Sequence, residues 1–414
     1  MDGEAALDDL SKVADGHVRP AGPGDAIDGV RPSYVATPSS TEETAELLRV
    51  AAQHGLHLVA KGSGTKQDWG MPPSRVDLVI DTTGLAGVVE HAAGDLITVV
   101  RAGTTVIDLQ STLAAADQQL ALDAPFPSAT VGGTVATNIS GPRRVLYGTL
   151  RDLLIGITFV RADGAVAKAG GKVVKNVAGY DFAKLLAGSY GTLGLITEVA
   201  LRCHPLPKTQ RAVSIEVPSG DVAADAGLRV LGSQLVPAAV EVNQPVEGPA
   251  TVIVLIEGVE SGVGARAETT QELLGAGSEI IELPDSFAHY PFGPGDVGLK
   301  ITTTMSGVGP ILSLARVLGD RLGVPISGRG SVAGVLYIAM PADTDPAVAG
   351  QVLAELRTLA AVHAGAVVVL TGPAETRRAL DVWGPVSGLD LMCRLKDQLD
   401  PDHRLSPGRF VGGI

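Results

Sequence analysis

The residues of this chain best suited to bind an anion form a short loop at 61–66, Lys-Gly-Ser-Gly-Thr-Lys. Its glycines allow consecutive backbone N–H groups to point at an anion, and Lys61 and Lys66 add positive charge. Pyrophosphate is therefore the anion that we expect this loop to bind. Taken alone, the loop also has a plainer interpretation, because Gly/Ser turns are common on protein surfaces.

Two familiar phosphate-binding motifs do not fit this loop. A dinucleotide-binding Rossmann turn requires Gly-x-Gly-x-x-Gly, and Gln67 stands at the third glycine position. A P-loop requires four residues between its glycines and then Gly-Lys-Ser/Thr, and this spacing is also not met. The loop therefore represents another class of site.

Two later stretches are also rich in glycine and small hydroxyl residues. Residues 130–138 read TVGGTVATN, and residues 188–197 read GSYGTLGLIT. Gly188, Gly191 and Gly194 recur every third residue, which suggests a main chain laid against something flat or bulky, such as a cofactor. For any one of these glycines alone, a tight turn is the simpler explanation.

A strand, a helix and a second strand are predicted to position the first loop. An apolar run at 34–36 precedes Ser-Thr-Glu-Glu at 40–43, which has the spacing of a capping box and predicts the start of a helix. Gly55 fits the end of this helix, and residues 57–61 have strand character. The loop thus follows directly from a strand end.

A longer series of elements leads to the other two glycine stretches. The patterns predict strands at 76–81 and 95–103, a helix at 105–117 and a hairpin whose turn is Asp163-Gly164.

The order of these motifs resembles the FAD-binding domain of the vanillyl-alcohol oxidase/PCMH superfamily, and within it the FAD-binding E subunit of glycolate oxidase. The resemblance covers residues 32–207 and includes a late element, K-N-x-x-G-Y-D followed by G-S-x-G-T-L-G-x-I-T, matched at 175–181 and 188–197. It resumes at 395–409 with the tail L-K-x-x-x-D-P-x-x-x-L-x-P-G-R, in which Ser406 replaces a frequent asparagine.

The resemblance implies a set of cofactor-binding residues. The loop at 61–66 should bind the FAD pyrophosphate, residues 130–134 and Asn138 should lie along the diphosphate and flavin, and Ile196 should contact the cofactor through its backbone. The expected residues are Lys61, Gly62, Ser63, Gly64, Thr65, Lys66, Thr130, Val131, Gly132, Gly133, Thr134, Asn138, Lys175, Gly191 and Ile196.

We expect FAD to be bound non-covalently. Relatives with covalent flavin usually attach it to a histidine in the pyrophosphate loop or to a cysteine near the second glycine stretch. Here the loop has no histidine, and Cys203 and Cys393 lie elsewhere. His54 precedes the loop and is better explained as a solvated cation in the last turn of the predicted helix. We expect no metal site.

Composition restricts the partners. The 414 residues, 45% of them hydrophobic, are enough for two packed cores. A formal net charge of −13 argues against nucleic acid or an anionic membrane as the main partner. No apolar run is long enough to span a bilayer, and the acidic N-terminus does not resemble a signal peptide. These features predict a cytoplasmic protein, with peripheral attachment to the inner face of a membrane through partners left open.

The predicted fold class is α+β. From Thr209 onward, strand-like runs alternate with helical ones, which predicts an antiparallel sheet covered by helices. The expected organisation is a loosely attached lead-in at 1–30, a two-subdomain PCMH-type FAD-binding domain at 31–207, an α+β cap domain with an antiparallel sheet at 208–385, and a C-terminal segment at 386–414 that returns to the FAD domain.

The residues that bind and oxidise the substrate are expected in the cap domain, but the sequence does not identify them. Flavin oxidation of a 2-hydroxy acid needs a cation for the carboxylate and a base for the hydroxyl proton. The related catalytic subunit and the D-lactate dehydrogenases carry an H-x-G-D-G-N-x-H metal element, which this chain lacks. No base is assigned, because each candidate is better explained as structural or solvated. These candidates are His289, Tyr290, Lys300, Arg329, Arg377 and Arg378.

Two functions of different class follow. In the favoured one, the chain is the FAD-binding accessory subunit of a glycolate oxidase complex. A homologous FAD-containing catalytic subunit then oxidises glycolate to glyoxylate, and an iron-sulfur subunit accepts the electrons. In the other, the chain alone is a flavin dehydrogenase for a small 2-hydroxy acid. A standalone enzyme for a sugar or lactone is weaker, because such relatives typically carry histidine in the pyrophosphate loop.

Overall fold

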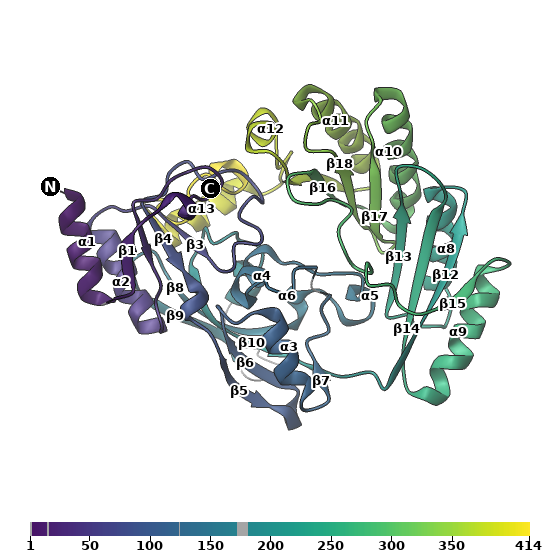
Figure 1. Cartoon of the computed structure of the whole chain (residues 1–414), viewed down its shortest axis with the longest axis horizontal. Coiled ribbons are helices and arrows are strands. Elements are labelled where there is room, and N and C mark those ends of the chain that lie inside the picture. Colours follow the sequence, from purple (N-terminus) through teal and green to yellow (C-terminus); the bar gives the residue numbers. More distant parts are fainter. Residues whose placement is uncertain (1, 15, 124, 172–180) are drawn as a thin grey trace. The chain divides into compact units, whose positions relative to one another are not determined.

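The computed structural model describes residues 2–14, 16–123, 125–171 and 181–414. The chain divides into two compact units (Figure 1). The first comprises Met1–Ile139, Thr149–Leu206 and Pro385–Ile414, and the second comprises Ser140–Gly148 and Pro207–Gly384. Each unit combines helices with sheets, which confirms the predicted α+β class.

The first unit contains a small sheet that ends at the glycine loop. Its elements are α1 (Asp2–Val13), β1 (Val18–Pro20), β2 (Tyr34–Ala36), α2 (Thr41–Gln53), β3 (Leu58–Lys61) and β4 (Leu78–Asp81). The strand order is β1-β2-β4-β3, and β2, β4 and β3 run parallel. As the capping-box spacing predicts, α2 begins after Ser40, whose side chain accepts a hydrogen bond from the backbone N–H of Glu43.

Residues 1–30 are not the loosely attached lead-in expected from their composition. Helix α1 packs against α2, as Figure 1 shows, and Leu10 is fully buried in the core beneath this sheet. The ring of His54 is 3.0 Å from the Asp9 carboxylate, so this histidine pairs with α1 instead of being solvated. The prediction was based on overall composition, which does not show that the apolar residues Ala6, Leu10 and Ala14 recur at four-residue spacing and so share one face of a helix.

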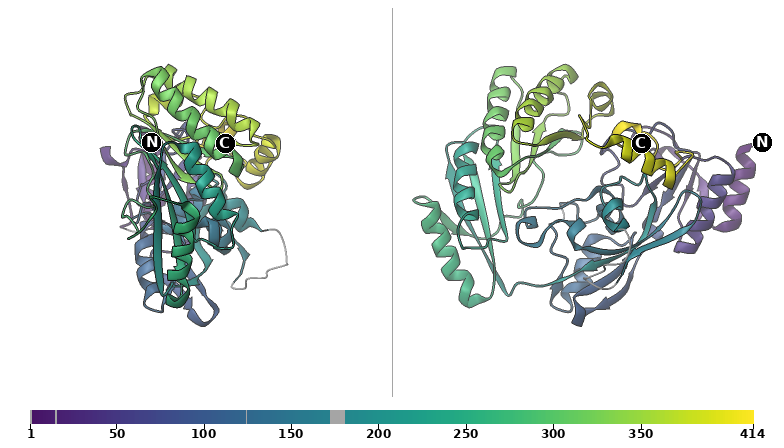
Figure 2. Two further views of the ribbon diagram at one scale, coloured as in Figure 1. Left: turned by 90° about the vertical axis from the view of Figure 1, so that its right-hand side faces the viewer. Right: turned by 180° about the vertical axis from the view of Figure 1, so that it is seen from behind.

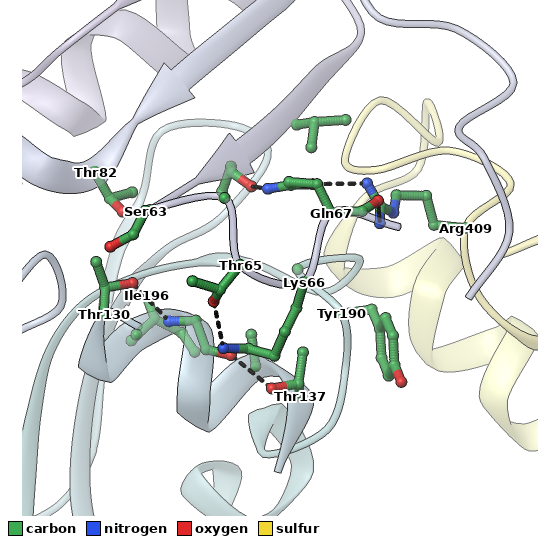
Figure 3. Close-up of a pocket in the computed structure, with 18 of the residues that line it drawn as sticks. Ser63, Thr65, Lys66, Gln67, Thr82, Thr130, Thr137, Tyr190, Ile196 and Arg409 are labelled. Carbon is green, nitrogen blue, oxygen red and sulfur yellow. Dashed lines mark hydrogen bonds between the residues drawn. The ribbon is translucent and has the colours of Figure 1, made fainter. Parts of the chain in front are cut away.

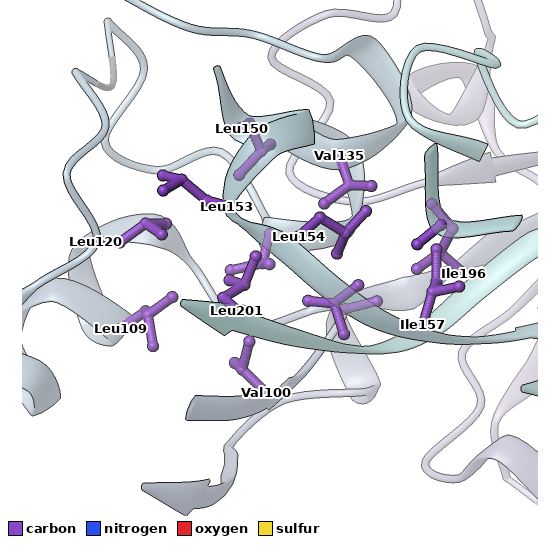
Figure 4. Close-up of a cluster of buried hydrophobic side chains, with 14 of the residues drawn as sticks. Val100, Leu109, Leu120, Val135, Leu150, Leu153, Leu154, Ile157, Ile196 and Leu201 are labelled. Atoms are coloured by element: carbon purple, nitrogen blue, oxygen red, sulfur yellow. The ribbon is translucent and has the colours of Figure 1, made fainter. Parts of the chain in front are cut away.

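A second, antiparallel sheet forms the larger core of the first unit. Its strands occur in the order β5-β6-β10-β8-β9. Side chains from the sheet and from the helices beside it form one buried apolar cluster (Figure 4). The predicted hairpin is present as β8 and β9, which pair antiparallel around Gly164. The elements are β5 (Val88–Ala92), β6 (Ile97–Arg101), α3 (Val106–Ala114), α4 (Val131–Thr137), α6 (Leu150–Leu153), β8 (Leu154–Val160), β9 (Val166–Gly170), α7 (Phe182–Leu186) and β10 (Leu195–Arg202).

The C-terminal segment belongs to the first unit and is held there by one buried ion pair. In helix α13 (Leu389–Leu399), the ammonium of Lys396 donates to the carboxylate of Asp400 at 2.7 Å. The same ammonium donates to the backbone carbonyls of Thr192 at 2.8 Å and Leu405 at 2.9 Å. Both ionic side chains are fully buried, and the three donors of the ammonium are all used.

The tail after α13 also pairs with the start of β3. The backbone N–H of Leu58 donates to the carbonyl of Arg404, and the N–H of Ser406 donates to the carbonyl of Leu58, both at 2.8 Å. The tail therefore fixes the strand from which the glycine loop emerges.

The second unit is an eight-stranded antiparallel sheet with four long helices. The strand order is β15-β12-β14-β13-β17-β18-β16-β19. The helices pack side by side in the order α9, α8, α10, α11 and cover one face (Figures 1 and 2). The elements are β12 (Thr209–Val217), α8 (Gly220–Leu231), β13 (Ala239–Gln244), β14 (Ala250–Gly258), α9 (Glu260–Leu274), β15 (Glu279–Ile281), β16 (Val297–Thr302), α10 (Val308–Leu322), β17 (Ser327–Ser331), β18 (Val335–Met340), α11 (Pro346–Val362) and β19 (Ala366–Thr371).

The segment Ser140–Gly148 interrupts the continuous first domain that the sequence predicts, because it packs with the second unit. It contains α5 (Arg144–Tyr147). The guanidinium of Arg143 and the hydroxyl of Tyr147 donate to the buried Glu257 carboxylate at 2.8 and 3.0 Å. Burial, and then the neighbouring carboxylate, raise the pKa of Tyr147.

The remaining elements are short. They are η1 (Pro23–Asp25), η2 (Thr82–Gly84), η3 (Ala93–Asp95), β7 (Gln118–Gln119), β11 (His204–Pro205), η4 (Met305–Gly307), α12 (Ala374–Ala379) and η5 (Val411–Gly413). Within the described ranges, none of the helices combines the length and the apolar character needed to cross a bilayer.

Replacing Lys396 by methionine should lower the free energy of unfolding by about 3–5 kcal/mol, because Asp400 is then left charged and buried without its cation. Denaturant unfolding of the purified chain measures this loss. Lys168→Met, on the exposed side of β9, is the matched control and should change little. A loss below about 1 kcal/mol, as for an exposed ion pair, would contradict the role of this pair.

Candidate functional site

A pocket in the first unit brings the three glycine stretches together (Figure 3). Its empty space, including solvent at the mouth, is about 740 Å³. One wall is the loop after β3, another is α4, and a third is the segment that leads into β10. Arg409 of the C-terminal tail completes the lining.

Most of the predicted site residues line this pocket. They are Gly62, Ser63, Gly64, Thr65, Lys66, Thr130, Gly132, Gly133, Gly191 and Ile196. The side chain of Lys61 instead packs beside Gly64. Lys175 lies outside the described residues.

Three predicted residues of the second stretch do not line the pocket, because residues 131–137 form a helix. Val131 and Thr134 lie on the buried side of α4, and are 1% and 4% exposed. Asn138 ends the helix in a left-handed conformation, and its side-chain oxygen is buried without a hydrogen-bond partner among the described residues.

The sequence prediction missed several lining residues. Ala136 and Thr137 follow from the helical period once α4 is known, and Gln67 and Thr82 are brought in by tertiary folding. Tyr190 occupies the variable position of the G-S-x-G motif. The full set is Val59, Ala60, Gln67, Thr82, Ala136, Thr137, Tyr190 and Arg409, while Gly194 of the predicted glycine repeat also lines the pocket.

The loop presents a row of unused backbone donors. Within the part of the chain that the structure describes, the N–H groups of Ser63, Gly64, Thr65 and Lys66 donate no hydrogen bond to the protein. Backbone N–H groups that are buried in folded proteins are nearly always paired, and these four successive donors at a pocket wall are available to an outside acceptor, either water or an anion. Successive N–H groups of this kind bind anions.

The loop needs glycine at two positions for different reasons. Gly64 has a φ of +77°, which side chains rarely adopt. Gly62 has no such strain, but a Cβ there would lie 2.1 Å from the hydroxyl oxygen of Thr130. Because Thr130 is the N-cap of α4, the absence of a side chain at Gly62 allows the loop and the helix to approach each other.

Lys66 places a positive charge at the pocket. It is only 8% exposed, its ammonium is 3.0 Å from the Thr65 hydroxyl, and it lies 5.5 Å from the centre of the Phe126 ring. No described carboxylate pairs with it, and no acidic residue is among the described residues that line the pocket. Burial lowers the pKa of the Lys66 ammonium to about 8. A bound anion would compensate this desolvated charge.

Arg409 holds the far end of the same loop. Its buried guanidinium donates to the side-chain oxygen of Gln67 at 2.9 Å, to the Gln67 carbonyl at 2.7 Å and to the Trp69 carbonyl at 3.0 Å. These bonds, visible in part in Figure 3, join the C-terminal tail to the chain that follows the loop and hold that chain in place.

Comparisons with known proteins identify the kind of site. Residues 32–170 match a family described as "FAD binding domain". The chain also superposes on p-cresol methylhydroxylase with a TM-score of 0.78, covering 99% of this chain and 96% of that one, at 15% identity. Residues 32–170 thus form an FAD-binding domain, and the superposition shows the fold that the chain shares with this enzyme. A second solved structure with this fold is alkyldihydroxyacetonephosphate synthase, with a TM-score of 0.70 over 91% of this chain and 76% of that one, at 16% identity.

Sequence relatives include two glycolate oxidase subunits. The flavoprotein is 32% identical to GlcD of Bacillus subtilis over 52% of this chain and 46% of the relative. It is 34% identical to GlcE of Escherichia coli over 40% of this chain and 49% of the relative. The match thus spans about half the length of these relatives. An uncharacterised FAD-linked oxidoreductase of Mycobacterium tuberculosis is 27% identical over 92% of this chain and 91% of its own.

The pocket residues fit FAD. Free N–H groups and a desolvated ammonium suit its diphosphate, and the glycines of the loop and of α4 leave room for it to approach the backbone. None of the described lining residues is a histidine or a cysteine. Cys203 is buried in the core, where burial raises its pKa to about 11.

The candidates in the second unit do not form a comparable site. Arg329 is held by both carboxylate oxygens of Glu241, at 2.7 and 3.0 Å. Arg377 is buried and donates to a backbone carbonyl, while His289 and Arg378 are exposed. Tyr290 stacks against Phe292 with ring centres 4.8 Å apart. In the described ranges, no group of three or more His, Cys, Asp or Glu residues could hold a metal ion.

Gly62→Ala should weaken FAD binding by at least about tenfold, equivalent to about 1.4 kcal/mol, because the new Cβ pushes the loop away from Thr130. Equilibrium titration of the apoprotein with FAD measures this effect. Gly24→Ala, where a Cβ meets no atom, is the control, and adding Thr130→Ala to the first variant should restore part of the affinity. Unchanged binding by Gly62→Ala would refute the assigned loop.

Lys66 predicts a specific pH dependence. The ammonium is charged below about pH 8 in the empty pocket, and a bound anion raises its pKa further. FAD affinity should therefore be constant below about pH 8 and fall as the pH rises from there toward the pKa of the bound state. In Lys66→Met the affinity should be weaker at neutral pH and lack this decline. A wild-type affinity that stays constant from neutral pH to about pH 10 would contradict a charge contact by Lys66.

Proposed function

We propose that the pocket holds FAD non-covalently, with the diphosphate on the free N–H groups of Ser63–Lys66 and beside the Lys66 ammonium. The main support for this proposal is that these four successive backbone N–H groups donate no hydrogen bond to the described protein. FAD, when bound, accepts two electrons and a proton equivalent from an alcohol carbon and passes the electrons on. The residues of this chain contribute binding, orientation and shielding of the cofactor.

The chain is proposed to be the FAD-binding subunit of a glycolate oxidase or dehydrogenase complex. The complex would oxidise a small 2-hydroxy acid, glycolate to glyoxylate, with electrons passing to an iron-sulfur partner. Similarity to the GlcD and GlcE subunits supports this proposal. A homologous FAD-containing subunit would be the catalytic partner.

The second unit supports an accessory role in substrate oxidation. A substrate carboxylate needs a cation that is not already neutralised. In the second unit, Arg329 is paired with Glu241 and Arg143 with Glu257, each through a carboxylate that is nearly fully buried. Freeing either guanidinium would leave a buried carboxylate without its partner, which is strongly unfavourable.

A standalone dehydrogenase for a 2-hydroxy acid is the second candidate. It is favoured by 32% identity to a D-lactate dehydrogenase of Archaeoglobus fulgidus over 52% of this chain and 50% of the relative. The M. tuberculosis relative, which matches nearly the whole chain, is described as an FAD-linked oxidoreductase.

Anaerobic addition of glycolate or D-lactate to the purified, FAD-loaded chain distinguishes the two candidates. The proposed accessory subunit should keep its visible flavin absorption when alone and lose it only when the partner chains are added, because Arg329 and Arg143 of the second unit are already paired with Glu241 and Glu257. Bleaching by the lone chain would overturn the accessory role. A complex assembled with the Gly62→Ala chain at an FAD concentration that leaves this weakened site largely empty is the control.

A further inference from the structure

Tyr190 has an unusual backbone for an aromatic residue. Its φ is +55°, in the left-handed region that bulky side chains rarely occupy. The backbone N–H of Tyr190 donates to the Ala136 carbonyl at 2.9 Å, and that of Gly188 donates to the Val135 carbonyl at 3.0 Å. The last turn of α4 therefore imposes this conformation. Conformations of this kind persist where the surrounding structure enforces them, and they cluster at ligand sites.

The enforced backbone places the Tyr190 ring at the pocket wall. Figure 3 shows the ring beside α4, on the side of the pocket where Arg409 enters. Its centre is 5.5 Å from that of Phe410, with the planes inclined by 30°. Phe410 is itself fixed in the tail, because its N–H donates to the Ile414 carbonyl at 2.8 Å. The phenol ring is thus in contact with a fixed neighbouring ring and remains half-buried.

Tyr190 differs in kind from the rest of the lining. Among the described residues that line the pocket it is the aromatic one, and the others are small, aliphatic or polar. An aromatic face is the surface on which a planar heterocycle stacks with little loss of side-chain entropy. FAD contains two such rings, the isoalloxazine and the adenine.

We propose that Tyr190 is a stacking platform, whose ring, held by a left-handed backbone and supported by Phe410, packs against a planar ring of the bound FAD. This proposal rests on the assignment of the pocket to FAD. It assigns Tyr190 a positioning role that the glycine motif around it does not predict, because the motif leaves this residue open.

The test distinguishes the contribution of the Tyr190 ring to FAD binding from the effect of its left-handed backbone. Tyr190→Gly removes the ring and relieves the left-handed strain, so a purely structural role predicts an apoprotein that binds FAD as before. Tyr190→Phe keeps the ring and removes the hydroxyl. Ala364→Gly is the matched control, since Ala364 also has a positive φ, +51°, but lies in the second unit. Titration of each apoprotein with FAD, with thermal unfolding recorded alongside, provides the readout.

The platform predicts that Tyr190→Gly weakens FAD binding by at least about tenfold, while Tyr190→Phe stays within about twofold and Ala364→Gly is unchanged. If the glycine variant does not fold, Tyr190→Asn replaces it, because asparagine tolerates the left-handed region. Wild-type affinity in the folded glycine or asparagine variant overturns the proposal.

Two further measurements identify the stacked ring. A phenol stacked on isoalloxazine quenches flavin fluorescence, so bound FAD should then be brighter in Tyr190→Phe than in the wild type. If adenine is the partner, fluorescence is unchanged, and ADP affinity falls in Tyr190→Gly in parallel with FAD affinity. Neither result depends on turnover. A wild-type chain that binds FAD but does not assist glycolate oxidation would overturn the proposed function and leave this test intact.

Discussion

The buried ammonium of Lys396 is the interaction on which the first unit depends. It joins helix α13, the segment entering β10 and the C-terminal tail through Asp400 and the carbonyls of Thr192 and Leu405. The tail in turn pairs with β3 and anchors the glycine loop through Arg409. Two walls of the pocket that are far apart in sequence, the loop after β3 and the segment into β10, are thus held by one short C-terminal stretch. Because a buried ammonium is stable only when all its donors are satisfied, these walls must form together.

The polar groups of the pocket differ from the Lys396 ammonium, because the protein itself does not provide partners for them. Four backbone donors of the loop and the desolvated charge of Lys66 face a space without described acidic residues. In the second unit, by contrast, two buried charged pairs are matched within the protein, Arg329–Glu241 and Arg143–Glu257. This contrast separates structural charge from charge kept for a ligand. It is the physical reason for assigning the anion of FAD to the first unit.

Features set by local chemistry could be predicted from the sequence, and features set by tertiary contacts could not. The N-cap at Ser40, the hairpin turn at Gly164 and the glycine loop each depend on a few adjacent residues. In contrast, Lys396 and Asp400 at four-residue spacing would suggest an exposed helical pair, and only the carbonyls that surround them explain their burial. Strand β17, Ser-Gly-Arg-Gly-Ser, lacks strand composition because α10 and β18 approach Gly328 too closely for a side chain. Helix α4 was missed since its two glycines disfavour helix, and Arg409 reaches the site only through the fold.

The central claim is that the free amides of the loop bind the diphosphate of FAD. A crystal structure of the chain with bound FAD tests it most directly. The diphosphate oxygens should lie within hydrogen-bonding distance of the backbone nitrogens of Ser63–Lys66, with the Lys66 ammonium beside them. A diphosphate located elsewhere, or loop amides bonded to protein atoms while FAD is present, would contradict it.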